Sequence, residues 1–160
     1  MTERRIKSGF PVVILLFFQT TFCLAQNPQP VKWNFKSEPV TRPETTLIIT
    51  ASIAPGWHIY SQFMEKGGPL PTGFSFERSE EYSLVGKPEE KGKAIKFYDD
   101  IFMIDIIWYS DVVTFSQKIK LYEPFATVKG KVEFMVCNNQ MCLPVNEQIF
   151  NIEVKPLKNP

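Results

Sequence analysis

Short runs of alternating apolar and polar residues dominate the chain, and a helical repeat is nowhere sustained. Val31 to Lys36 alternates with a period of two, the pattern of a half-buried β-strand. Thr45 to Ile53 is rich in β-branched residues and is followed by Ala54-Pro55-Gly56. Further strands are predicted at Trp57 to Tyr60, Gly73 to Glu77, Tyr82 to Val85, Ile101 to Trp108, Val112 to Leu121, Lys129 to Val136 and Gln148 to Val154, between Pro, Gly, Asp, Asn and charged clusters.

This number and spacing of strands predicts an all-β fold, an immunoglobulin-like antiparallel β-sandwich. The buried tryptophan and the long-range cysteine pair of antibody domains do not occur together here, so the strand pattern alone supports the prediction. Other sandwich topologies remain open. Between the strands, the segment from Gly67 to Thr72 reads as a rigid turn, and the charged segment from Lys87 to Lys93 as a solvated loop.

The N-terminus has the pattern of a secretory signal peptide. Basic residues come first, then the apolar run Phe10 to Phe18, then a short stretch that ends in Ala25. We therefore expect a signal peptide over residues 1–25 and a single domain over residues 26–160. No later stretch approaches the roughly 18 consecutive apolar residues of a membrane span, so the mature protein is expected to be exported and soluble.

Cys23 admits a second interpretation, as the lipid-modified first residue of the mature chain. Phe22 before it is bulkier than the residue that lipoprotein signals place there, which favours cleavage after Ala25 and an unanchored protein. Cleavage removes Cys23 and leaves Cys137 and Cys142, in a compartment where disulfides persist. The net charge of +1 for the full chain falls to near −1 after cleavage, which indicates neither nucleic acid nor an anionic membrane as partner.

The two remaining cysteines lie in the stretch FMVCNNQMCLP, Phe134 to Pro144. A disulfide between them would close a short loop and stabilise the fold by only about 2 kcal/mol in the chain-entropy model. A disulfide that closes a loop of roughly sixty residues would contribute about 4 kcal/mol. Such a bridge is a poor staple. It suits thiol–disulfide exchange better, because a nearby second thiol can resolve a mixed disulfide. Composition alone leaves both an inert hairpin disulfide and exchange chemistry open.

Three segments carry a family resemblance: GWHIYSQ (Gly56 to Gln62), KFYDD (Lys96 to Asp100) and the cysteine stretch itself. In this order and spacing, over roughly Val31 to Val154, the chain resembles the N-terminal periplasmic domain of the thiol:disulfide interchange protein DsbD. The resemblance implies an immunoglobulin-like domain that takes electrons from a membrane-embedded donor and reduces thioredoxin-like periplasmic proteins.

The resemblance also implies roles for individual residues. Cys142 would form the mixed disulfides and Cys137 would resolve them, which makes this pair the catalytic residues of a protein-disulfide reductase. Phe97 and Tyr98 would belong to a cap loop over the pair, and His58 and Tyr60 would line the site. No cofactor beyond the dithiol is implied.

The chain departs from the family at several positions. The enterobacterial form has one more residue between its cysteines, Val145 stands where a second proline is common, and Ile95 and Lys96 replace acidic residues. The sequence ends at Pro160 without the family's membrane core or its C-terminal thioredoxin-like domain, so we expect the electron donor to be a separate protein.

Other interpretations of the same residues stay open. His58 could be an ordinary half-exposed strand residue, and Phe97 and Tyr98 an ordinary buried strand entry. Met141, with Met135 and His58, raises a Cu(I) site, because soft sulfur ligands suit that ion. The alternative function is a non-catalytic secreted immunoglobulin-like binding module with a structural hairpin disulfide.

Overall fold

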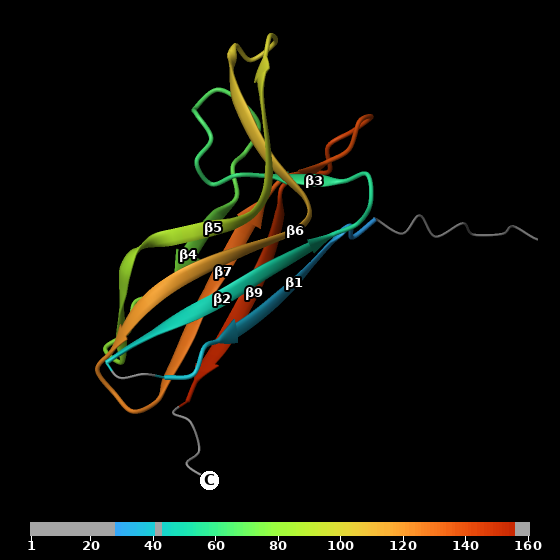
Figure 1. The fold of residues 1–160 in the computed structure, drawn as a ribbon. Coiled ribbons are helices and arrows are strands. Elements are labelled where there is room, and N and C mark those ends of the chain that lie inside the picture. The colour runs from blue at the N-terminus through green and yellow to red at the C-terminus, as the bar shows by residue number, and fades with distance from the viewer. Residues whose placement is uncertain (1–27, 41–42, 156–160) are drawn as a thin grey trace, which may run out of the picture.

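Two antiparallel β-sheets make up the described part of the chain (Figure 1). The computed structural model describes residues 28–40 and 43–155. The strands are β1 (Val31–Ser37), β2 (Glu44–Ile53), β3 (His58–Tyr60), β4 (Gly73–Phe76), β5 (Tyr82–Asp99), β6 (Ile104–Leu121), β7 (Ala126–Phe134), β8 (Val136–Cys137) and β9 (Asn146–Val154). The predicted signal peptide, Cys23 included, lies outside the described residues. Within them, no helix has the length and apolar character needed to cross a membrane.

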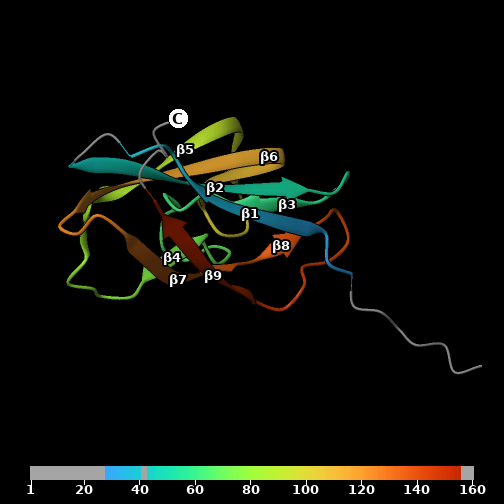
Figure 2. The same ribbon diagram turned by 90° about the horizontal axis from the view of Figure 1, so that it is seen from below.

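The larger sheet has the order β1-β2-β6-β3-β8, with β5 paired to β6, and the smaller sheet has the order β4-β7-β9. Figure 2 shows the two layers, with β2 and β6 in one and β7 and β9 in the other. This is the antiparallel sandwich that the strand pattern predicts, and the immunoglobulin-like fold class is confirmed by the structural similarity reported below.

The core lies between the two sheets, where the period-two pattern directs alternate side chains inward. In β2, Leu47, Ile49 and Ala51 are fully buried, and Val128 and Val132 of β7 are buried equally. Each fully buried leucine, isoleucine or valine side chain contributes roughly 1.5–3 kcal/mol by leaving water. Aromatic side chains pack against one another in this core between the sheets: Trp33, Phe35, Phe74, Phe76, Phe115, Phe134 and Phe150.

The prediction of a loop from Lys87 to Lys93 is wrong, because these residues lie inside β5. Among the described strands β5 pairs only with β6, so it is an edge strand, and charged side chains are common there because they discourage pairing with other chains. The register shifts between Val85 and Glu89, next to Gly86, whose φ of 70° is in the left-handed region. The polar composition of this segment therefore reflects an exposed edge strand with a β-bulge, and not a loop.

The predicted strands Ile101 to Trp108 and Val112 to Leu121 are one strand, β6, whose partner changes along its length. Its later residues pair with β2, whereas Trp108 and Tyr109 pair with β3. Asp111, with a φ of 63°, stands at this change of partner. The hairpin of β5 and β6 that precedes Asp111 in the sequence, residues 94–109, is called the arm below. Figure 1 shows the arm standing out from one end of the sandwich, the end where β3 and the loop that follows β8 also lie.

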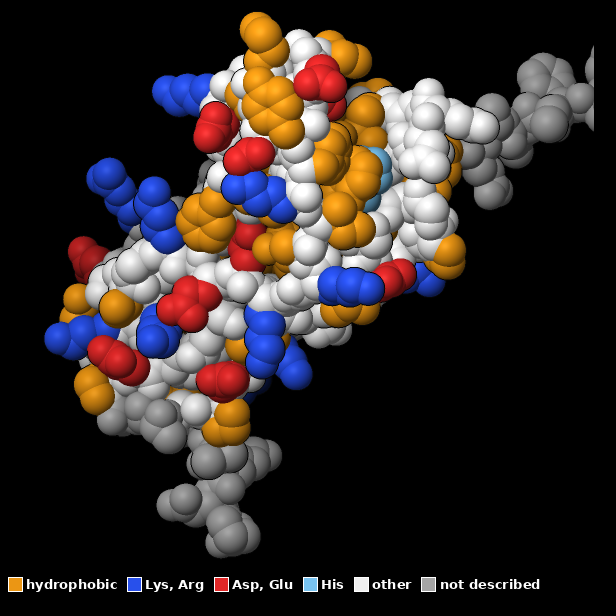
Figure 3. All heavy atoms as spheres, turned by 45° about the horizontal axis from the view of Figure 1, so that its top comes forward, with side chains coloured by type: hydrophobic (Ala, Val, Ile, Leu, Met, Phe, Trp, Pro, Cys, Tyr) orange, Lys and Arg blue, Asp and Glu red, His pale blue; other side chains and the backbone are white. Residues whose placement is uncertain are grey.

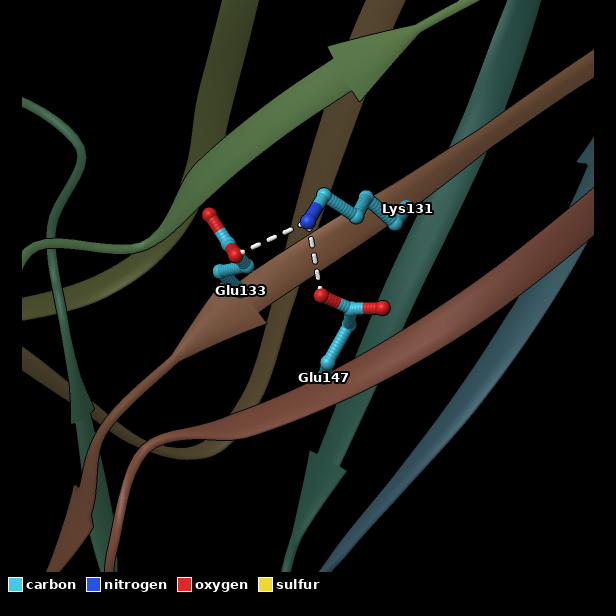
Figure 4. A network of polar contacts seen from close by, with 3 residues as sticks. All are labelled: Lys131, Glu133 and Glu147. Carbon is cyan, nitrogen blue, oxygen red and sulfur yellow. Dashed lines mark hydrogen bonds and ion pairs between the residues drawn. The ribbon is translucent and has the colours of Figure 1, made fainter.

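On the smaller sheet, Lys131 lies between two carboxylates (Figure 4). Its Nζ is 3.0 Å from Glu133 Oε1 and 2.7 Å from Glu147 Oε2. Glu133 and Glu147 are directly opposite each other in the register of β7 and β9, where two like charges repel. The lysine offsets that repulsion, and both acids are substantially exposed. This charged cluster is therefore explained by the sheet surface, without a ligand.

Candidate functional site: the cysteine pair

Cys137 and Cys142 form a disulfide across a tight turn, with their Cα atoms 4.0 Å apart. Asn138 organises the turn. Its backbone N–H donates to the Met141 carbonyl at 2.9 Å, and its side-chain Oδ1 accepts from the backbone N–H groups of Gln140 at 2.8 Å and Met141 at 2.9 Å. An asparagine that bonds its own backbone in this way favours a turn. The sequence between the cysteines thus brings both sulfurs within bonding reach.

The two cysteines differ in their exposure to solvent. Cys137, at the end of β8, is only 1% exposed, whereas Cys142, after the turn, is exposed. One sulfur-bearing residue is thus available to a partner protein and the other is shielded. This asymmetry suits a pair in which one thiol attacks a partner and the second acts from within the domain.

Strand β3 runs alongside Cys137 and supplies two site residues that the sequence predicts. His58 is the register partner of Cys137. The His58 and Tyr60 side chains share a face of β3, with ring centroids 5.3 Å apart and His58 Nε2 3.3 Å from the Tyr60 hydroxyl. Both are buried, with exposures of 6% and 5%. The interpretation of His58 as a half-exposed strand residue is therefore wrong.

The arm covers this group of residues from the other side. Ile106, Tyr60 and Cys137 form a second buried cluster, separate from the main core, and Met64, Ile104, Trp108 and Met135 pack against it. The Trp108 ring lies over His58, with centroids 3.8 Å apart. Ile106 and Trp108 are not among the site residues predicted from the sequence. The signal was present, because Ile104, Ile106 and Trp108 alternate with other residues and so share one face of β6.

Phe97 and Tyr98 lie in β5 within the arm, rather than in a loop, and they point in opposite directions. Phe97 is paired with Ile106, and its ring centroid is 5.0 Å from that of Trp108. Tyr98 is paired with Asp105 and is 59% exposed. Phe97 therefore contacts Trp108, which packs against the buried cluster of Cys137, and Tyr98 lies on the outer face of the arm.

His58 and Tyr60, the two titratable side chains of β3 beside the pair, are neutral at pH 7. Burial lowers the pKa of His58 to about 4, so its imidazole is uncharged at neutral pH. Burial raises the pKa of Tyr60, and the negative charge of Asp99 raises it further. His58 and Tyr60 can therefore donate or accept hydrogen bonds here, but they contribute no charge to a neighbouring thiolate.

Across residues 28–40 and 43–155, no group of three or more His, Cys, Asp and Glu side chains is placed to hold a metal ion. Met64 Sδ already accepts the backbone N–H of Ile107 at 3.2 Å. The copper hypothesis rests on Met135, Met141 and His58, as it did in the sequence, and stays untested.

The structure is thus that of a small β-sandwich domain with one exposed and one buried cysteine, joined by a disulfide at one end of the sandwich. These features define a class of domain built around a dithiol. A family model described as thiol:disulfide interchange protein DsbD, N-terminal, matches residues 25–154, and the chain belongs to this family of thiol–disulfide exchange domains. Among curated proteins, none matches the sequence.

Solved structures that share the fold include domains of ScsB and DsbD. The N-terminal periplasmic domain of ScsB from Proteus mirabilis is similar with a TM-score of 0.54 and 17% identity, over 79% of this chain and 47% of that one. The chain thus spans about half the length of that ScsB structure. The Neisseria meningitidis DsbD N-terminal domain, in its reduced form, is similar with a TM-score of 0.51 and 16% identity, over 76% of this chain and 86% of that one. Identities this low support the fold alone.

Proposed function

We propose that this protein is a protein-disulfide reductase that passes electrons through Cys137 and Cys142 to thioredoxin-like partner proteins. The observation that carries the proposal is the asymmetry of the pair: Cys142 is exposed, and Cys137 is buried beneath the arm, next to Tyr60 and Ile106. Membership in the DsbD N-terminal family supports the same chemistry.

The proposed reaction moves two electrons. In the reduced protein, the Cys142 thiolate attacks one sulfur of the partner disulfide, which forms a mixed disulfide and releases the partner's other sulfur as a thiolate. The Cys137 thiolate then attacks Cys142 Sγ, forms the intramolecular disulfide seen here and releases the second partner thiolate. The released thiolates take up protons from water. The partner is thereby reduced and this protein oxidised.

We also propose where the reaction takes place. The predicted signal peptide over residues 1–25 would deliver the domain of residues 26–160 to the periplasm, and a membrane-embedded protein would reduce the disulfide again. The similar ScsB domain is itself described as periplasmic, which supports this assignment.

The proposal is tested by trapping. A Cys137→Ala variant retains Cys142 but cannot resolve the mixed disulfide, so it should accumulate a covalent complex with a thioredoxin-like partner that dithiothreitol dissolves. Cys142→Ala is the matched control and should trap nothing. If neither variant forms such a complex with any oxidised thioredoxin-like protein, exchange is excluded.

The reduction potential separates exchange from the alternative of an inert bridge. A structural disulfide in an exported protein has a potential below about −300 mV, and an exchanging pair lies higher, near that of its partners. Equilibration of the unmodified protein with glutathione or dithiothreitol buffers measures it. A value far below −300 mV would favour the non-catalytic binding module.

A further inference from the structure

Glu90 accepts hydrogen bonds at both carboxylate oxygens from three groups in two parts of the chain. Its Oε2 accepts from Ser61 Oγ at 2.7 Å and from the Tyr109 hydroxyl at 2.8 Å, and its Oε1 accepts from the backbone N–H of Gln62 at 2.6 Å. Ser61 is 1% exposed and Tyr109 is 6% exposed. Both oxygens act as acceptors, the arrangement that a carboxylate favours.

The position of Glu90 on β5 is unusual for an acid. Its register partner is Phe115, whose side chain is completely buried, so the Glu90 side chain lies on the core side of the sheet. A carboxylate on that side is costly unless donors replace water. Ser61, Gln62 and Tyr109 supply those donors, and burial together with the bond to Glu90 raises the pKa of Tyr109 and keeps its hydroxyl protonated.

These bonds join the base of the arm to the segment that follows β3. Tyr109 is where the arm meets the sandwich, and Ser61 and Gln62 directly follow Tyr60, which contacts Cys137 in the second buried cluster. Gln62 Nε2 also donates to the Pro88 carbonyl at 2.7 Å, so the same segment is bonded twice to β5. Glu90 is thus bonded to the base of the arm and to the segment after β3, and Ile106 of the arm and Tyr60 of β3 bury Cys137.

We propose that Glu90 is a positioning residue that holds the arm closed against β3 and thereby sets how fast Cys137 can react. It touches neither sulfur and acts through Tyr109 on one side and Ser61 and Gln62 on the other. As a role in the exchange reaction this inference rests on the proposed function, but shielding of Cys137 can be measured without any partner protein.

Glu90→Gln tests the proposal with almost no change in shape. The backbone N–H of Gln62 can only donate, so the amide oxygen should face it. The NH₂ group then faces Ser61 and Tyr109, whose hydroxyls must turn to accept and lose their bonds to a charged oxygen. The arm should open more often, and iodoacetamide should alkylate Cys137 of the fully reduced protein about tenfold faster, the effect expected from losing a hydrogen bond to a charged group. Mass spectrometry assigns the alkylated residue.

Glu89→Gln is the matched control, because Glu89 is the exposed neighbour on the same strand. It should leave the alkylation rate unchanged. Val128→Ala, in the core of the smaller sheet, controls for lower stability alone and should also leave it unchanged well below its unfolding temperature. Glu90→Asp, which keeps the charge, should recover part of the protection.

A Cys137 alkylation rate in Glu90→Gln equal to that of the unmodified protein would overturn the proposal, as would an equal acceleration in Val128→Ala. Failure of the proposed exchange gives a different result: the trapping variants capture no partner, while the effect of Glu90→Gln on alkylation remains. Where exchange does occur, Glu90→Gln should change the KM for a protein disulfide more than kcat, because docking competes with closure of the arm.

Discussion

Trp108 lies directly over His58, with 3.8 Å between the ring centroids. His58 is in turn the register partner of Cys137. Three residues that are far apart in the sequence therefore lie next to one another at this end of the molecule. The arm supplies the tryptophan, β3 the histidine and β8 the cysteine. Figure 3, which brings this end of the molecule forward, shows hydrophobic side chains gathered over the arm and its surroundings. Residues of the arm therefore help to bury Cys137.

Trp108→Ala should uncover the site. The half-buried indole packs on His58 and Phe97, so its removal should cost about 2–3 kcal/mol of unfolding free energy, below the roughly 3–5 kcal/mol of a fully buried aromatic residue. Cys137 should be alkylated faster. Trp108→Phe should retain most of the stability and the protection, because Nε1 is buried without a hydrogen-bond partner among the described residues. Urea unfolding and alkylation kinetics measure both effects. Equal losses in the two variants would refute this account.

Phe97 and Tyr98 should respond differently to substitution, because they occupy opposite faces of the arm. Phe97→Ala removes an aromatic contact with Trp108 and should cost about 1 kcal/mol and accelerate alkylation of the reduced pair. Tyr98→Ala removes a more exposed side chain next to it and should change neither quantity measurably. The two variants are compared by thiol titration at one pH. If Tyr98→Ala gave the larger acceleration, the assignment of the inner face would be wrong.

His58 should make the stability of the protein depend on pH. Its pKa is 6.5 as an unperturbed side chain and about 4 in the folded protein, where burial disfavours the charged form. Between these values the unfolded chain binds the proton more strongly, so the free energy of unfolding rises with pH through this window. The stabilisation is complete above about pH 6.5 and is lost as the pH falls toward 4.

This pH dependence is checked by urea unfolding at several pH values, together with His58→Gln, which keeps a hydrogen-bonding side chain but does not titrate. The variant should show a flatter profile between pH 4 and 6.5. Proton NMR of the imidazole provides a direct measurement. A titration midpoint near 6.5 in the folded protein would contradict the predicted burial effect.

Local pattern was sufficient for the sandwich and for the cysteine pair, because strand alternation and cysteine spacing are both short-range features. It was insufficient for β5, where Lys87 to Lys93 has a polar composition but still pairs with β6. The strand is specified by a long-range partner, which composition does not reveal. The same limit applies to the site. Alternation places Ile106 and Trp108 on one face of β6, but the element that this face meets depends on the change of strand partner at Asp111, which is a long-range feature.

Gly130 should tolerate no side chain, although it lies within the regular strand β7. A Cβ there would meet the Ser75 carbonyl oxygen and would lie 2.6 Å from Phe150 Cζ. Because one obstacle is backbone, Gly130→Ala should separate β4 from β7 and cost about 2 kcal/mol, within the range for an overpacked core.

Gly73 on β4 provides the control for this substitution, since a Cβ at that position meets nothing within 4 Å. Gly73→Ala should leave stability unchanged or raise it by up to about 1 kcal/mol, because it restricts the unfolded chain. Urea unfolding of both variants measures the difference. Both positions are in the smaller sheet, so neither substitution should alter the alkylation rate of Cys137. A Gly130→Ala variant as stable as the unmodified protein would show that the β4–β7 contact is looser than the structure indicates.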